Sequence, residues 1–231
     1  MQPFDCIIYS AGGSGDWLSY LIGKTCKSHK SFCHNEFNKI SVFHIKTYSS
    51  GIQNSISHNQ YKTIPEDKIL EEIQIYELIF KNELFARINL HPPGIEDDDI
   101  KKFEKIIDYF IKNHHTRLLF LHDDSYESFK LTFFCHYYIF YYEKYGYNIR
   151  RIREIKKYLS EEINKVNEIL SGYKMHLIKF PITKYILDQD FDSFINQFKS
   201  LYEVEDEKMV RKIFFDYSHN RLEAMKIYEE L

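Results

Sequence analysis

Cysteine, proline and glycine are scarce in this sequence, whose 231 residues include 4 Cys, 5 Pro and 8 Gly. The cysteines are too few and too scattered for the disulfide framework of a small secreted protein, so we expect reduced thiols. No linker rich in proline, glycine or serine separates one part of the chain from another, and no internal repeat is evident. We therefore expect a single α/β domain over residues 1–231, long enough to bury a sizeable core.

Long hydrophobic runs and an excess of one charge are missing too. No apolar run approaches the ~20 residues that cross a bilayer, and the N-terminus lacks the pattern of a signal peptide. We expect no membrane insertion and a cytoplasmic location. A formal net charge of −3 gives no global field for nucleic acid, which is not an expected partner. The bias toward Ile, Lys, Asn, Tyr and Phe is typical of an AT-rich genome, such as that of a phage or virus, whose protein would occupy the host cytoplasm.

Short apolar runs alternate with helical patterns along the chain, which predicts a parallel sheet flanked by helices. The expected strands are 4–9, 40–46, 84–91, 117–121 and 175–180. The expected helices begin near Asp16 and then cover 65–80, 96–113, 125–145 and 147–170, and the polar segment 49–62 should be a surface loop. The C-terminal region, 191–201 and 205–231, is expected to be helical and to pack on the rest of the domain.

A glycine-rich turn follows the first expected strand. It runs from Ser10 to Gly15 with the sequence SAGGSG. Glycines let backbone N–H groups point inward, and the start of the following helix adds partial positive charge, so the turn suits an anion such as phosphate. No lysine follows Gly15, so this is not a Walker loop. The alternative is a tight strand-to-helix turn without a ligand, with Ser14 or Asp16 as the helix cap.

The segment 7–18, IIYSAGGSGDWL, resembles the phosphosulfate-binding loop of the sulfotransferase family, where a strand leads into Ser-Gly-Thr-Thr-Trp-Leu. Here 14–15 and 17–18 match, with one residue fewer between them, and a glycine stands where the family has lysine. The resemblance implies a P-loop-like fold and phosphoadenosine phosphosulfate as the cofactor. It assigns the cofactor contacts to Gly12, Gly13, Ser14, Gly15, Asp16 and Trp17.

A second point of resemblance is the segment 87–93, RINLHPP, which is similar to a family strand that ends at the catalytic histidine. The resemblance implies His91 as the base, and Thr132 or Ser128 as a loose substitute for a nucleotide-binding serine. The residue that stabilises charge is left open among Arg87, Lys24 and Lys130. The family's ribose-phosphate arginine and its C-terminal Lys-Gly motif have no counterpart. The plainer interpretation of His91 is a histidine that merely ends a strand.

Two other polar groupings have simpler explanations. The segment HDD at 122–124 could hold Mg²⁺ beside a nucleotide, but Asp124 or Ser125 equally suits a helix cap, which we favour. The cysteines and histidines between 26 and 34 crowd into one short basic loop, whereas structural zinc joins two separated pairs. We therefore expect no metal.

The sequence thus predicts a sulfotransferase-like protein that moves a sulfuryl group to a hydroxyl or amine acceptor. Its partners would be a small-molecule nucleotide and that acceptor. Its many tyrosines could also leave an exposed patch through which a homo-oligomer forms. The alternatives are a non-catalytic binding or structural module on a degenerate P-loop-like fold, and a divergent nucleotide kinase. If the Asp16 carboxylate or neighbouring side chains fill the anion cavity, the prediction of a transferase fails and only the prediction of the fold remains.

Overall fold

The computed structural model describes residues 3–10, 14–27, 59–80, 86–94, 96–122, 125–137 and 148–229. Within them, four parallel strands lie in the order β2-β1-β3-β4. Their bounds are Pro3–Ile8 (β1), Ala86–Leu90 (β2), His115–Phe120 (β3) and Leu177–Lys179 (β4). The predicted parallel sheet flanked by helices is confirmed. The strand expected at 40–46 lies outside the described residues, and the segment 49–62 is described only from Asn59, where Gln60–Thr63 forms a short 3-10 helix (η2).

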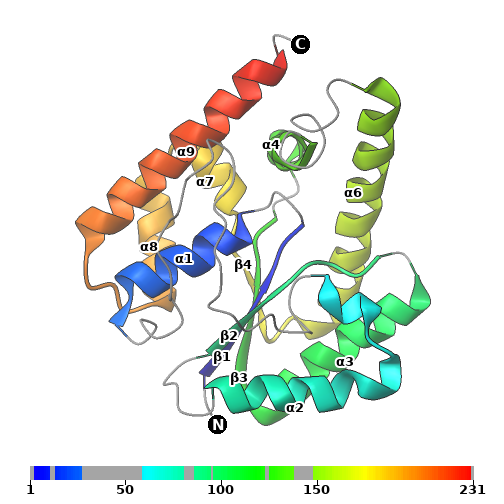
Figure 1. The fold of residues 1–231 in the computed structure, drawn as a ribbon. Coiled ribbons are helices and arrows are strands. Elements are labelled where there is room, and N and C mark those ends of the chain that lie inside the picture. Colours follow the sequence, from blue (N-terminus) through cyan, green and yellow to red (C-terminus); the bar gives the residue numbers. More distant parts are fainter. Residues whose placement is uncertain are drawn as a thin grey trace.

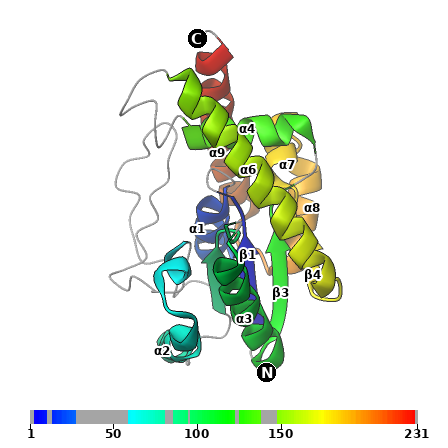
Figure 2. The same ribbon diagram turned by 90° about the vertical axis from the view of Figure 1, so that its right-hand side faces the viewer.

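Helices cover both faces of the sheet (Figures 1 and 2). One face carries α1 (Gly15–Thr25), α7 (Ile182–Asp188), α8 (Phe191–Leu201) and α9 (Glu207–Glu229). The other carries α2 (Ile69–Phe80), α3 (Asp97–Asn113) and the C-terminal part of α6 (Ile149–Leu170). Helix α4 (Tyr126–Tyr137) lies beyond the carboxyl ends of the strands and packs against α6, α7 and α9. The C-terminal helices therefore share a core with the sheet.

The burial of each strand follows from its place in the sheet. Residues 4–10 are all buried, as expected of a central parallel strand that is covered on both faces. By contrast, β4 is a short edge strand with half-exposed residues. In α3, Phe103, Ile106, Ile107 and Phe110 recur at helical spacing and face the sheet, and three aspartates occupy its first turn.

The helices depart from expectation in two places and confirm it in a third. The segment at 65–80 opens with a 3-10 turn, Glu66–Lys68 (η3), before α2 begins. Helix α7 was not expected, because it has only seven residues and follows Pro181, which indicated the end of a strand. The helix ends at Asp188, and the next residue, Gln189, has a left-handed φ of 51°. The cap expected at the start of α4 is confirmed, since the Ser125 hydroxyl accepts from the amide of Ser128 at 3.1 Å.

Cys6 and Cys26 are free and buried. Burial raises the pKa of the Cys6 thiol well above its ordinary value, and that of Cys26 to about 11, so neither is a ready nucleophile at neutral pH. Every helix of the described residues is too short or too polar to cross a membrane.

Candidate functional site

The carboxyl ends of β1 and β2 form the edge at which a ligand is expected. The chain passes from β1 to β2 on one side and then returns to β3 on the other side of β1. In open α/β sheets such a reversal leaves a crevice beyond the strand ends, where ligands bind. The residues that follow these strands are Tyr9, Ser10 and His91, and we call this region the carboxyl edge.

The start of α1 at this edge is held by the C-terminal helix. Ser14 precedes the helix with φ 71°, a left-handed conformation that non-glycine residues adopt at a cost. Its hydroxyl makes no cap bond to α1; instead it accepts from the Tyr217 hydroxyl at 2.9 Å. Arg221, one helical turn later in α9, donates to the Tyr217 oxygen. Arg221, which is only 5% exposed, is therefore connected to Ser14 through two hydrogen bonds, with the Tyr217 hydroxyl between them.

Gly15 is required by the close approach of an aromatic ring. A Cβ at this position would lie 2.0 Å from ring carbons of Tyr9. Tyr9 is itself 3% exposed, and its ring meets that of His91 edge-on with centroids 4.9 Å apart. The strand end, the helix start and the histidine are thus packed on one another around the Tyr9 ring.

Asp16 is bound by the sheet. Its Oδ1 accepts from the Tyr9 hydroxyl at 2.7 Å and from the Asn89 amide at 2.9 Å. The Asn89 oxygen in turn accepts from the Ser19 hydroxyl at 2.7 Å, which closes a polar network between α1 and β2. The carboxylate therefore has partners in β2 and at the end of β1, whereas Ser14 is held from α9.

His91 is positioned by η2. The Asn59 side-chain nitrogen lies 3.0 Å from His91 Nδ1, and the Tyr61 hydroxyl donates to the His91 carbonyl at 3.1 Å. If the Asn59 amide is turned to present its oxygen, that oxygen accepts a hydrogen bond from Nδ1–H, and the unprotonated Nε2 can then act as a base. This histidine is half-buried, as an acid–base group at the edge of a site should be.

Three of the predicted site residues are buried inside the protein. Arg87 is buried and donates to the Ser19 carbonyl at 3.0 Å; four residues along β2, it is roughly 13 Å from His91. Trp17 is 1% exposed and stacks on the Tyr217 ring at 4.6 Å, within the core. Thr132 is buried in α4.

Several predicted residues lie outside the described part of the chain. They are Gly12 and Gly13 of the glycine-rich turn, and Asp123 and Asp124 of the magnesium alternative. Among the described residues, no group of three or more His, Cys, Asp or Glu side chains could hold a metal ion.

Two buried charged residues at this edge were missed by the sequence analysis. Arg221 falls on the apolar stripe of α9 after Val210, Phe214 and Tyr217. Glu162 falls on that of α6, between Leu159 and Val166, and is 3% exposed. The signal was present in both helices, because a charged residue on an apolar stripe is rarely buried without a specific role.

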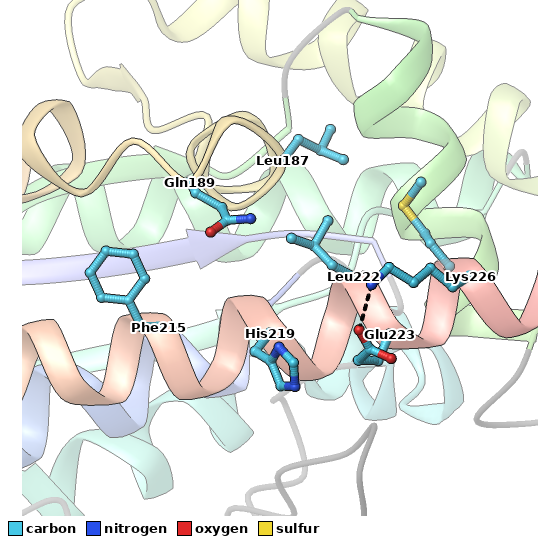
Figure 3. A pocket seen from close by; sticks show the side chains of 8 residues that line it. Leu187, Gln189, Phe215, His219, Leu222, Glu223 and Lys226 are labelled. Carbon is cyan, nitrogen blue, oxygen red and sulfur yellow. Dashed lines mark hydrogen bonds and ion pairs between the residues drawn. The ribbon is translucent and has the colours of Figure 1, made fainter.

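A groove of about 550 Å³ lies elsewhere, between α7 and α9 (Figure 3). It is lined from α9 by Phe215, His219 and Leu222, among others, and on the other side by Leu187 of α7 and by Gln189, which follows this helix. At 100° per residue these α9 side chains lie on the face opposite Tyr217 and Arg221, so the groove is separate from the carboxyl edge.

The carboxyl edge combines a buried cation beside a helix start, a half-buried histidine and a buried carboxyl group. Such a set can attract an oxyanion and can exchange a proton close to it. When the chain is compared with protein-family models, with curated proteins and with solved structures, no match is found.

Proposed function

We propose that this protein is a sulfotransferase-like transferase that binds the oxyanion of a phosphoadenosine phosphosulfate-type donor at the start of α1. The acceptor would be a hydroxyl or amine. The single observation that carries the proposal is the chain of hydrogen bonds from Arg221 through Tyr217 to Ser14. It supports a permanent positive charge beside the helix start, in place of the lysine that the glycine-rich turn lacks.

The charges at the carboxyl edge favour an oxyanion. A guanidinium stays ionised at every physiological pH, and the start of a helix adds partial positive charge in the same place. The Asp16 carboxylate opposes this, but it already accepts two hydrogen bonds from Tyr9 and Asn89. One charge-assisted hydrogen bond from Arg221 would contribute about 1.5–3 kcal/mol to binding.

The residues present suit one end of the donor better than the other. Arg221 and the amides at the start of α1 match a phosphosulfate group, whereas Trp17, buried under Tyr217, is not available to stack on adenine. The donor would supply an activated sulfuryl group. His91 would take the proton of the acceptor, and Arg221 would hold the negative charge left on the leaving phosphate.

Calorimetric titration tests the proposal through the oxyanion. We expect adenosine 3′,5′-bisphosphate to bind with micromolar affinity at pH 7 and low salt, and adenosine, which lacks both phosphates, to bind at least tenfold more weakly. Added salt should weaken the binding of the bisphosphate, because the proposed site is cationic. A folded protein that gives no heat with millimolar bisphosphate would exclude this donor class.

A non-catalytic binding module on the same fold is the second candidate, and the pairing of Asp16 favours it. A carboxylate with two partners of its own at the helix start is the arrangement that a closed anion site would have. This alternative predicts that Asp16→Asn leaves nucleotide binding undetectable. Under the transferase proposal, removal of the opposing charge should tighten the binding of the bisphosphate several-fold.

A further inference from the structure

Helix α2 is apolar on two opposite sides, and the described residues cover only one of them. The inner side packs on the sheet and on α3 and consists of Ile69, Ile73 and Tyr76. The outer side carries Leu70, Ile75 and Leu78, which are 41%, 50% and 70% exposed. A helix that is hydrophobic all round is normally buried all round. The outer side therefore has the composition of a surface that another molecule covers.

The exposed apolar side chains of α2 form one patch, which we call the outer face. At 100° per residue they fall within an arc of about 140°, opposite the buried side chains, and the helix lies on the outside of the fold (Figures 1 and 2). They are three of the seven large hydrophobic side chains that are exposed in the described part of the chain, and the other four are scattered. Single exposed apolar residues are ordinary, whereas a cluster on one helix indicates an interaction site.

The outer face is surrounded by negative charge. Between residues 66 and 77 the only basic residue is Lys68, and the acidic residues are Glu66, Asp67, Glu71, Glu72 and Glu77. Around the helix axis Glu71 falls between Leu78 and Ile75. Its side chain is 61% exposed and pairs with Lys68 at 3.0 Å. Because so exposed an ion pair contributes little to stability, Glu71 can exchange Lys68 for a cation of a partner at little cost.

Helix α2 is held in place from its inner side. The Tyr76 hydroxyl donates to the carbonyl of Arg87 in β2. One carboxylate oxygen of Glu77 accepts from the Tyr109 hydroxyl at 2.7 Å, and the other lies 2.6 Å from His114 Nε2. The outer face is thus formed before any partner binds, which lowers the entropic cost of binding, and substitutions on it leave these contacts intact.

We propose that the outer face of α2 is a docking surface for a basic amphipathic helix of another protein. The apolar stripe of that helix would cover Leu70, Ile75 and Leu78, and its flanking lysines or arginines would pair with Glu71 and the acidic residues around it. A second copy of this chain fits less well, because an isologous interface through α2 sets the same acidic residues against one another. An anionic lipid surface would be repelled by them.

A designed peptide tests the chemistry of the partner. A fluorescein-labelled helical peptide of leucine and lysine, with the leucines along one stripe, is titrated with the protein and followed by anisotropy. One reference peptide has the same composition without the stripe, and another has glutamate in place of lysine. We expect the striped leucine–lysine peptide to bind with a Kd of about 1–10 μM at low salt, roughly tenfold more tightly than the peptide without the stripe. The leucine–glutamate peptide should not bind, and added salt should weaken the complex.

Substitutions on α2 show where the peptide binds. We expect the double substitution Ile75→Gln, Leu78→Gln to weaken binding about tenfold, and Glu71→Gln to weaken it several-fold. Met209→Gln is the matched control, because it removes a 42% exposed hydrophobic side chain from α9, and it should bind as the wild type does. Circular dichroism establishes that each variant is folded.

Several results would overturn the inference. Absence of binding by the wild type, or equal binding by the wild type and the double variant, would mean that the outer face does not hold a basic helix. A wild-type dimer that the double substitution converts into a monomer, measured by light scattering, would mean that a second copy covers it. Binding to phosphatidylserine vesicles that the double substitution abolishes would assign the face to a membrane surface. None of these results bears on nucleotide binding, on which the docking surface does not depend.

Discussion

At the scale of single residues, the contact between Gly15 and Tyr9 decides how β1 meets α1. The Tyr9 ring occupies the space in which a side chain at position 15 would lie, and its hydroxyl is tied to Asp16. We expect Gly15→Ala to lower the free energy of unfolding by at least about 2 kcal/mol, because the buried ring cannot withdraw without losing that bond. Urea unfolding measures the change.

Gly172 supplies the matched control for this substitution. A Cβ there would have no atom within 4 Å. Gly172→Ala should be neutral or stabilise by about 0.4–1 kcal/mol, because alanine restricts the unfolded chain. Equal effects at the two positions would mean that the Tyr9 ring does not enforce glycine at position 15.

Glu162 makes the stability of the protein depend on pH. Its pKa is raised by burial to about 7 from an ordinary 4.5. Between these values the folded protein holds a proton that the unfolded chain has lost, so this residue lowers stability as pH rises from about 4.5 to 7. We expect Glu162→Gln to be more stable than the wild type at pH 8 by roughly 3 kcal/mol, and nearly equal to it at pH 4.5. Urea unfolding of both proteins at the two pH values checks this, and a difference that does not change with pH would contradict it.

Residue roles were only partly predictable from the sequence. The resemblance pointed to Ser14, Gly15 and His91, and these do lie together at the carboxyl edge. It also pointed to Trp17, which the structure places in the core, since a motif fixes spacing but not what a later helix packs against. Arg221 acts on Ser14 from more than 200 residues away, a proximity that no local pattern could predict.

At the scale of secondary-structure elements, a buried ion pair fastens α8 and β3 to β1. Asp5 is fully buried and accepts two hydrogen bonds from Arg117, at 2.7 and 3.0 Å, and one from the Tyr202 hydroxyl at 2.7 Å. Arg117 also donates to the carbonyl of Leu201, at the end of α8. Although burial raises the pKa of Asp5, the carboxylate has a partner for each oxygen.

Breaking this pair should be costly. We expect Asp5→Asn to destabilise by about 3–5 kcal/mol, because it leaves the Arg117 guanidinium without its counter-charge. Tyr202→Phe removes one hydrogen bond and should cost about 1 kcal/mol. Denaturant unfolding distinguishes the two, and a smaller effect for Asp5→Asn than for Tyr202→Phe would contradict the account.

Elements with strong periodicity were predicted well, and weak ones were not. The apolar spacing of α3 and the bounds of α8, Phe191–Leu201, follow from local sequence alone. Helix α7 has too few residues to show a period and buries Ile182 and Ile186 only because α8 and the sheet surround them. The order of the strands likewise depends on packing between distant segments.

At the scale of the whole molecule, function is proposed to arise where the first strand, the first helix and the last helix meet. The chain reverses at β1, which leaves its carboxyl end as the natural ligand site. Helix α9 closes over α1 and brings Tyr217 and Arg221 to Ser14 (Figure 1). The C-terminal helix is therefore part of the proposed site as well as part of the core.

The contribution of Arg221 to oxyanion binding is the central claim, and one titration tests it most directly. Adenosine 3′,5′-bisphosphate is titrated into the wild type, Arg221→Gln, Arg221→Lys and Arg211→Gln, after thermal unfolding has shown each to be folded. Arg211 lies on the same helix, where it covers the Phe191 ring at 4.1 Å. The account predicts affinity about 10- to 100-fold weaker for Arg221→Gln, a smaller loss for Arg221→Lys and none for Arg211→Gln. Undiminished affinity in a folded Arg221→Gln protein would contradict it.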